Sequence, residues 1–269
     1  MRYTGLHATS EYELEDGDSN ATQSFDFNKT SMFTGYRQII CQINVLLLVT
    51  VNCCTTFHVV YIRNFLIIVA DNLLPNHIFP DLARTMLYGS VFVVPQICVL
   101  VMSHVVKQFG AFKVCQITFY IKIVSSATMY AIGPHHSWIL ASFILTDSSI
   151  TIATGQYFDL LMSDCIDEDM KTYNKRSPRS SMFYGMNALF VKPTQSLAPM
   201  LVLAILSRSG YESGKDEMAS DPDDILNLHE VMFQIVCFVP LILGLIQTLI
   251  WTKYSLRDSH LDTKRLHVV

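Results

Sequence analysis

The stretch that decides the fold lies at residues 85–106 and reads Thr85-Met-Leu-Tyr-Gly-Ser-Val-Phe-Val-Val-Pro-Gln-Ile-Cys-Val-Leu-Val-Met-Ser-His-Val-Val106. It contains no Asp, Glu, Lys or Arg. A helix rises about 1.5 Å per residue and the hydrocarbon core of a bilayer is about 30 Å thick, so about 20 apolar residues are enough to cross it. The stretch is therefore predicted to be a transmembrane helix.

Five further segments have the same apolar character. In chain order, the six predicted spans cover about residues 40–70, 85–106, 112–133, 137–161, 181–207 and 231–252. They form a predicted six-helix transmembrane bundle over residues 38–254, with a polar, acidic tail at 1–37 and a second tail at 255–269. The predicted fold class is an all-α membrane protein.

The composition excludes several other classes of protein. Of the 269 residues, 51% are apolar and 16% are charged, whereas about 25% of the residues in a soluble domain are charged. This pattern excludes a soluble enzyme and a disordered chain, and a net charge of −4 does not favour a nucleic-acid partner. Seven cysteines are present without a Cys-x-x-Cys pair, so we expect buried thiols, and neither a bound metal nor a cofactor.

The distribution of Lys and Arg predicts the orientation in the membrane. Thirteen of them lie in the tails and in the connections 107–113 and 164–180, on one side, while the other side has Arg84, Arg208 and Lys215. Cytoplasmic segments carry the excess of basic residues, so both termini are predicted to be cytoplasmic. The acidic loop Glu212–Asp224 then faces outward or toward a lumen; the sequence does not specify the membrane.

Lys192 is the most informative ionisable residue inside a predicted span. A charge in the membrane costs roughly 2.5–3.5 kcal/mol on insertion scales. Lys192 lies near the middle of its span, next to Pro193 in the stretch Lys192-Pro-Thr-Gln-Ser-Leu-Ala-Pro199. Two prolines are expected to bend the helix and make its backbone irregular, which is tolerated against protein or a water-filled cavity. We interpret Lys192, with Asn187, Thr194 and Gln195, as the lining of a path for a polar solute; an ion pair that only fixes helix packing is the alternative.

Other polar residues in the spans are open to two interpretations each. Asp147 and Asp159 of the fourth span are candidate counter-charges for Lys192, and we include Asp147 in the predicted solute or ion path. Lys122 and Arg63 are expected to extend toward a membrane surface. His58 is expected to be a hydrogen-bonded packing residue rather than a proton carrier.

The connection after the fourth span has the highest density of charge. Asp164, Asp167, Glu168 and Asp169 precede Lys171, Lys175, Arg176 and Arg179. Paired carboxylates can hold a divalent cation, as in membrane phosphotransferases, but the following Glu168 and Asp169 do not fit that pattern. We therefore interpret Asp164, Asp167, Asp169 and Arg179 as a cytoplasmic gate that breaks and re-forms as helices move.

Two blocks of this region resemble the transmembrane protein 180 family of the major facilitator superfamily. They are Ser163-Asp-Cys-Ile-Asp-Glu-Asp169 and Ser181-Met-Phe-Tyr-Gly-Met-Asn-Ala-Leu-Phe-Val-Lys-Pro-Thr-Gln-Ser-Leu-Ala-Pro199. Val94-Pro-Gln96, Lys107-Gln-Phe-Gly110 and Phe57-His58 support the resemblance, which covers about residues 40–255. The blocks are more distantly similar to the glycoside–pentoside–hexuronide cation symporters such as melibiose permease, which share the Asp-x-x-Asp connection (here Asp164 and Asp167) and the Lys (here Lys192).

The resemblance implies that this chain corresponds to spans seven to twelve of a twelve-span carrier, the C-terminal half of the major facilitator fold. The principal cation-binding aspartates of the symporters lie in the other half, so a complementary N-terminal half is an expected partner. The implied function is secondary active transport of a sugar or other polar solute with H⁺ or Na⁺, by alternating access and without catalytic residues. The alternatives are a non-transporting membrane scaffold with an inherited carrier fold, and an intramembrane enzyme that uses the Asp cluster.

Overall fold

The computed structural model of the chain describes residues 34–75, 79–174, 177–208 and 222–256. The chain divides into two compact units, Met1–Gln42 and Ile43–Val269. In the first unit, the described residues 34–40 are helical. Most of the two predicted tails and of the predicted acidic loop Glu212–Asp224 lies outside the described residues.

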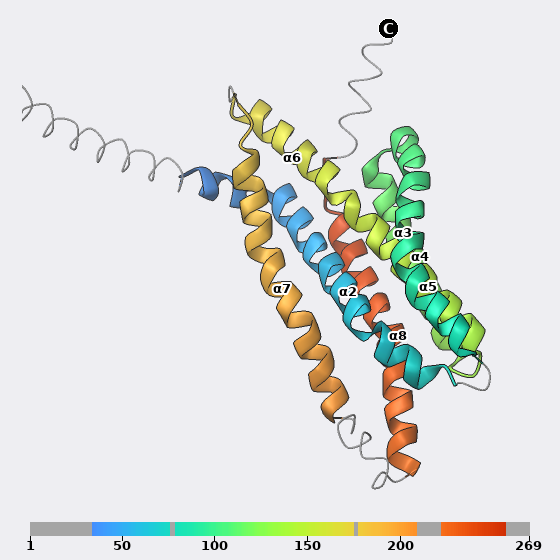
Figure 1. Ribbon diagram of the computed structural model, residues 1–269. Helices are drawn as coiled ribbons and strands as arrows, with labels where there is room; N and C mark the ends of the chain where they lie inside the picture. The colour runs from blue at the N-terminus through green and yellow to red at the C-terminus, as the bar shows by residue number, and fades with distance from the viewer. Residues whose placement is uncertain (1–33, 76–78, 175–176, 209–221, 257–269) are drawn as a thin grey trace, which may run out of the picture. The chain divides into compact units, whose positions relative to one another are not determined.

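The described secondary structure of the second unit is helical (Figure 1). Its helices are α2 (Ile43–Leu73), α3 (Asp81–Phe109), α4 (Ala111–Ile132), α5 (Ser137–Gln156), α6 (Phe158–Thr172), α7 (Ser180–Arg208) and α8 (Pro222–Trp251). The predicted all-α class is therefore confirmed. The predicted fourth span at 137–161 corresponds to α5 and the start of α6, which are separated by a turn at Tyr157.

Five helical stretches among the described residues are long and apolar enough to cross a membrane. They are Ile43–Leu73, Asp81–Phe109, Ser137–Thr172, Ser180–Arg208 and Leu228–Trp251. These support a multi-pass membrane protein, but the predicted number of six spans is not confirmed. The remaining long helix, α4, carries Lys113 and Lys122 together with polar residues such as Ser125 and Ser126, which lower its hydropathy.

The helices of this unit pack in pairs that are distant in sequence. α4 packs along α8, α2 along α7, and α3 along α5, while α2 also contacts α5 and α8 (Figure 1). α2 and α5 therefore lie in the interior, and many of their residues are buried, including polar ones such as His58, Asp147 and Thr151.

A cluster of aromatic residues joins the end of α8 to the starts of α4 and α6. Trp251 stacks on Phe112 with ring centroids 5.3 Å apart and on Tyr254 at 4.9 Å, and its indole N–H donates to the carbonyl oxygen of Phe112 at 3.1 Å. Phe158 meets the edge of the same indole. Burial raises the pKa of Tyr254, whose hydroxyl lies 3.4 Å from the Sγ atom of Cys165. This cluster fixes the ends of three helices relative to one another.

Glycines end α3 and α4. Gly110 has φ 87° and ψ 153°, and Gly133 has φ 84° and ψ 176°. Only glycine adopts these angles without strain, because a Cβ atom collides with the backbone there. Each glycine N–H donates to a carbonyl oxygen of the last helical turn, that of Val106 and that of Met129. The two tight connections thus follow from residue type.

α3 and α7 expose most of their surface. The buried residues of α3 are Leu87, Val91, Pro95 and Val106, and those of α7 are Phe183, Met186, Ala198, Val202 and Leu206. Large apolar side chains such as Leu100 of α3 and Leu189 of α7 are exposed. In a membrane protein, such faces contact lipid or a further protein segment.

Candidate functional site

The facing sides of α2 and α7 carry polar side chains. The Asn52 side-chain amide of α2 donates to the Oδ1 atom of Asn187 at 3.0 Å. Further along α7, Thr194 lies close to Cys53 of α2. Two of the predicted path residues, Asn187 and Thr194, therefore lie at the α2–α7 contact, where both are half-buried.

Lys192 and Gln195 occupy the exposed part of α7, next to this contact in sequence. Within the part of the chain that the structure describes, Lys192 makes no ion pair or hydrogen bond. An ammonium group in the middle of a membrane helix is stable only beside water or polar protein groups. Lys192 is exposed on α7, so its three N–H donors are available to an acceptor outside the described residues.

α7 is one uninterrupted helix although it contains Pro193 and Pro199. The helix is therefore not broken at its prolines, and the predicted bend stays a prediction. Each proline lacks an N–H, so the carbonyl groups of Leu189 and Gln195 lose their usual helical donors. The hydrogen bonds on either side of each proline keep the helix continuous. The two carbonyl oxygens add acceptors to the same stretch as Lys192.

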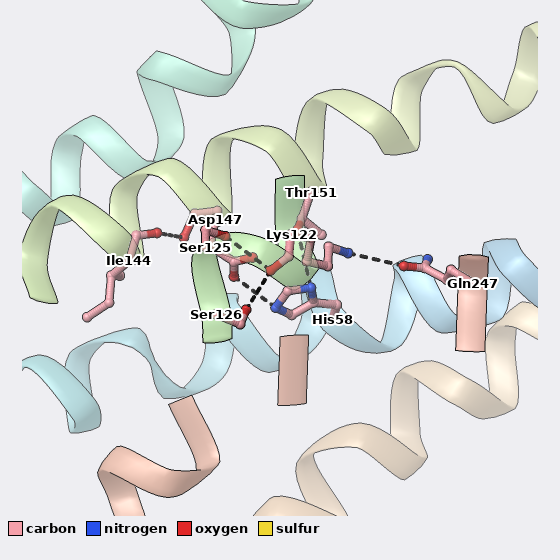
Figure 2. A network of polar contacts seen from close by, with 9 residues as sticks. His58, Lys122, Ser125, Ser126, Ile144, Asp147, Thr151 and Gln247 are labelled. Carbon is pink, nitrogen blue, oxygen red and sulfur yellow. Dashed lines mark hydrogen bonds and ion pairs between the residues drawn. The ribbon is translucent and has the colours of Figure 1, made fainter. Parts of the chain in front are cut away.

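A second set of polar residues lies inside the bundle (Figure 2). Lys122 of α4 is 3% exposed, and its Nζ atom donates to Oε1 of Gln247 in α8 at 3.2 Å. The Gln247 amide nitrogen donates in turn to Oγ1 of Thr55 in α2 at 2.7 Å. The expectation that Lys122 extends toward a membrane surface is wrong, because its face of α4 packs against α8 and finds an acceptor there.

His58 and Asp147 meet next to this chain of hydrogen bonds (Figure 2). The Nε2 atom of His58 in α2 lies 3.0 Å from Oδ2 of Asp147 in α5, and its Nδ1 atom lies 3.2 Å from Oγ1 of Thr151. Lys122 interacts electrostatically with both His58 and Asp147. The structure thus brings the predicted path residue Asp147 to His58 in the interior, and not to Lys192 on the exposed face of α7.

The predicted gate residues lie around the α6–α7 junction. The Nη2 atom of Arg179 donates to Oδ1 of Asp169 at 2.6 Å, and its Nε atom donates to Oδ2 at 3.0 Å. The guanidinium lies 5.6 Å from the ring centroid of Tyr173. Asp164 is buried and Asp167 is half-buried on α6. The structure therefore pairs Asp169 with Arg179 across one connection.

A wide hollow opens where α2 and α4 end and α8 begins. It has a volume of about 710 Å³, and its polar lining includes Asn72, His135, His229 and Glu230. The side-chain amide of Gln234 in the same wall donates to Glu230 at 3.2 Å. Sequence reasoning did not single out this hollow, because its walls come from three separate helix ends.

The sequence analysis also missed Gln247 and the role of Thr55. A glutamine in the last, otherwise apolar span is a usable signal, since a side-chain amide in a membrane helix needs a partner on another helix. The partner, Lys122, lies 125 residues away in the sequence. No local pattern indicates such a distant pairing.

Comparison with known proteins gives consistent similarities. The sequence profile of a family described as MFS/sugar transport protein matches residues 80–258. Transmembrane protein 180 of Gallus gallus is 27% identical over 231 residues, which cover 81% of this chain and 45% of that protein. Transmembrane protein 180 of Mus musculus is 26% identical over 247 residues, covering 84% and 47%. The chain spans about half the length of these relatives.

Proposed function

Because the chain belongs to the MFS/sugar transport protein family, we propose that it is the C-terminal six-helix half of a secondary active transporter. The proposed substrate is a sugar or another small polar solute, carried together with H⁺ or Na⁺. Transport proceeds by alternating access, in which two bundles rock about a site near the middle of the membrane. No covalent chemistry is involved, and we assign no catalytic residue.

The observation that carries this proposal is the position of Lys192. Lys192 lies on the exposed part of α7, five residues along the chain from Asn187, which contacts Asn52. Lipid is an unfavourable neighbour for its ammonium group, whereas water and a polar solute are favourable ones. Lys192, Gln195, Thr194 and Asn187 are therefore proposed to line one wall of the solute path.

The other wall is proposed to come from a complementary six-helix half. The exposed apolar faces of α3 and α7 supply surface for such a contact. The chain matches less than half the length of its relatives. In this arrangement the Asp169–Arg179 pair holds the α6–α7 junction at the cytoplasmic end.

Uptake into lipid vesicles tests the proposal. The purified chain is reconstituted alone, and also together with the part of the Mus musculus relative that it does not match, and a panel of radiolabelled monosaccharides and disaccharides is offered. We expect uptake above that of protein-free vesicles in the two-part preparation, and a loss of tenfold or more in Lys192→Ala. The matched control is Lys253→Ala, which removes an exposed lysine beyond the end of α8.

Two results would contradict the proposal at different points. Equal uptake by the Lys192→Ala variant would remove Lys192 from the solute path. No uptake of any solute by either preparation, with both proteins folded, would favour the alternative of a non-transporting membrane scaffold.

A further inference from the structure

His58 and Asp147 form a buried acid–base pair between two interior helices. His58 is 0% exposed and Asp147 is 7% exposed, and the 3.0 Å between Nε2 and Oδ2 is an ion-pair distance. Figure 2 shows the two side chains pointing toward each other from α2 and α5. Ionisable residues in this setting are costly, and in membrane proteins they mark functional positions such as proton relays.

Two buried atoms of this pair make no hydrogen bond to any described residue: Oδ1 of Asp147, and Nε2 of His58, which lies only within ion-pair distance of Oδ2. Asp147 also lines a small pocket of about 30 Å³, together with Tyr61, Phe65, Ile144, Ser148 and Val236. A buried carboxylate oxygen without a hydrogen-bond partner is costly, and a bound proton would reduce that cost.

The surroundings of His58 allow the pair to accept one proton. With a neutral imidazole protonated at Nε2, the Thr151 hydroxyl donates to Nδ1, across 3.2 Å. A proton added at Oδ1 of Asp147 converts the carboxylate to a carboxylic acid. The pair therefore takes up one proton while Nδ1 of His58 keeps its contact with the Thr151 hydroxyl.

Groups on the neighbouring helices restrict the ligand. Lys122 of α4 places a positive charge beside the pair. Tyr61 of α2 and Cys237 of α8 are neutral groups close to Asp147. Asp159 of α6 is exposed. In α3, the hydroxyl of Tyr88 donates to Asp71 and Cys98 is half-buried.

Metal cations that prefer oxygen are held by about six oxygen ligands, whereas the polar residues of the pocket wall are Tyr61, Asp147 and Ser148. A proton needs one acceptor atom. The pocket is therefore suited to H⁺ rather than to a metal cation.

We propose that His58 and Asp147 form the proton-binding site that couples H⁺ to the transport cycle. The coupling role rests on the proposed function, whereas proton binding itself rests on the geometry. Protonation of Asp147 removes the attraction between α5 and Lys122 of α4, so the packing between these helices depends on the bound proton. An inward H⁺ gradient thereby biases the bundle toward one of its two orientations.

Infrared difference spectroscopy of the chain in lipid vesicles tests proton binding without any substrate. On a change from alkaline to acidic pH, we expect a carboxylic acid carbonyl band in the wild type that is absent from Asp147→Asn. The matched control Asp159→Asn changes an exposed carboxylate of α6 and should keep the band. Thr151→Val retains Asp147 and should keep the band, because the proton added at Oδ1 of Asp147 does not use the Thr151 hydroxyl, which contacts Nδ1 of His58.

The wild-type spectrum decides the question even if Asp147→Asn does not fold. A wild type without a titrating acid band, or a band that persists in a folded Asp147→Asn, would overturn the proton site.

The coupling role is tested with a solute that the uptake experiment identifies. An inward H⁺ gradient should accelerate uptake severalfold in the wild type and in Asp159→Asn but not in Asp147→Asn, while solute exchange without a gradient persists in all three. Gradient-independent uptake by the wild type would overturn the coupling role. Failure of all uptake would contradict the proposed function and with it the coupling role, and the infrared result would still decide whether the pair binds a proton.

Discussion

Lys122 is a charged side chain held inside the bundle by partners on two helices. Its ammonium group donates to Gln247, whose amide donates to Thr55, and it lies within electrostatic reach of Asp147. A buried charge is tolerated when hydrogen bonds and an opposite charge replace its hydration. Removal of the Lys122 ammonium group therefore leaves the buried Asp147 carboxylate without the positive charge that compensates for its lost hydration.

We predict that Lys122→Met destabilises the protein by about 3–5 kcal/mol, because it leaves the Asp147 carboxylate buried without a cation. The double variant Lys122→Met with Asp147→Asn should recover part of this loss. Thermal unfolding in detergent, followed by circular dichroism, measures both effects. Lys113→Met, at an exposed position of the same helix, is the control; an equal loss in this control would assign the effect to helix α4 in general.

A close contact between α8 and α4 gives a second prediction at this scale. A Cβ atom on Gly244 would lie 2.9 Å from Cγ1 of Ile123 and 3.5 Å from Cδ of Lys122. Small residues allow such close approach between membrane helices. Gly244→Val should therefore lower the unfolding temperature, whereas Gly89→Val, where nothing lies within 4 Å, should have a much smaller effect. Equal losses in the two variants would contradict a specific α4–α8 contact.

At the scale of elements, the helix ends depend on backbone conformation rather than on contacts. Gly133 has a φ of 84°, and a Cβ atom there would meet nothing within 4 Å. We predict that Gly133→Ala destabilises the protein by about 1–3 kcal/mol through backbone strain alone. Gly89→Ala, inside α3 with equally open surroundings, should be neutral or slightly stabilising, because alanine favours helix. Unfolding curves for the two variants that coincide would rule out strain at Gly133.

The α6–α7 junction depends on the ion pair between Asp169 and Arg179. Asp169 is 1% exposed, so its carboxylate relies on the guanidinium for hydrogen bonds. Arg179→Gln should lower the unfolding temperature and speed amide hydrogen exchange around Tyr173. Arg179→Lys should lower the unfolding temperature by a smaller amount, because a single ammonium group can donate to Asp169 but not in the same bidentate way. Lys171→Gln, at an exposed position of the same segment, should change neither quantity.

At the scale of the whole molecule, α4 decides the topology. Five helical stretches among the described residues meet the length and hydropathy of a membrane span, and α4 would be the sixth. If α4 spans the membrane, the two ends of the chain lie on the same side; if it does not, they lie on opposite sides.

We predict that α4 is the sixth span, because it packs along α8 and α5 and buries its Lys122. Both ends of the chain then lie on one side, and the distribution of Lys and Arg predicts that this side is the cytoplasm. Epitope tags at either end, tested for protease access in sealed cells and in permeabilised cells, measure this. If the protease reaches one tag in sealed cells and the other tag only after permeabilisation, the two ends lie on opposite sides and six spans are excluded.

The sequence by itself determined the helical membrane class, the approximate helix ranges and the family resemblance. Apolar runs and helical rise are local properties, so α3 and α7 could be located without knowledge of their neighbours. The resemblance to the transmembrane protein 180 family, identified from residues 163–199, is confirmed by the relatives. The tight ends of α3 and α4 follow from Gly110 and Gly133 in the same local way.

The tertiary structure decided which polar residues meet. Thr151 contacts His58 from 93 residues away, and Lys122 contacts Gln247 from 125 residues away. Hydropathy identifies a charged residue in a span, but it does not state whether that residue faces lipid, a cleft or another helix. The direction depends on the rotation of each helix, which is set by the packing of α2, α4, α5 and α8 together. Lys192 is exposed and Lys122 is in the interior, and packing decides this difference.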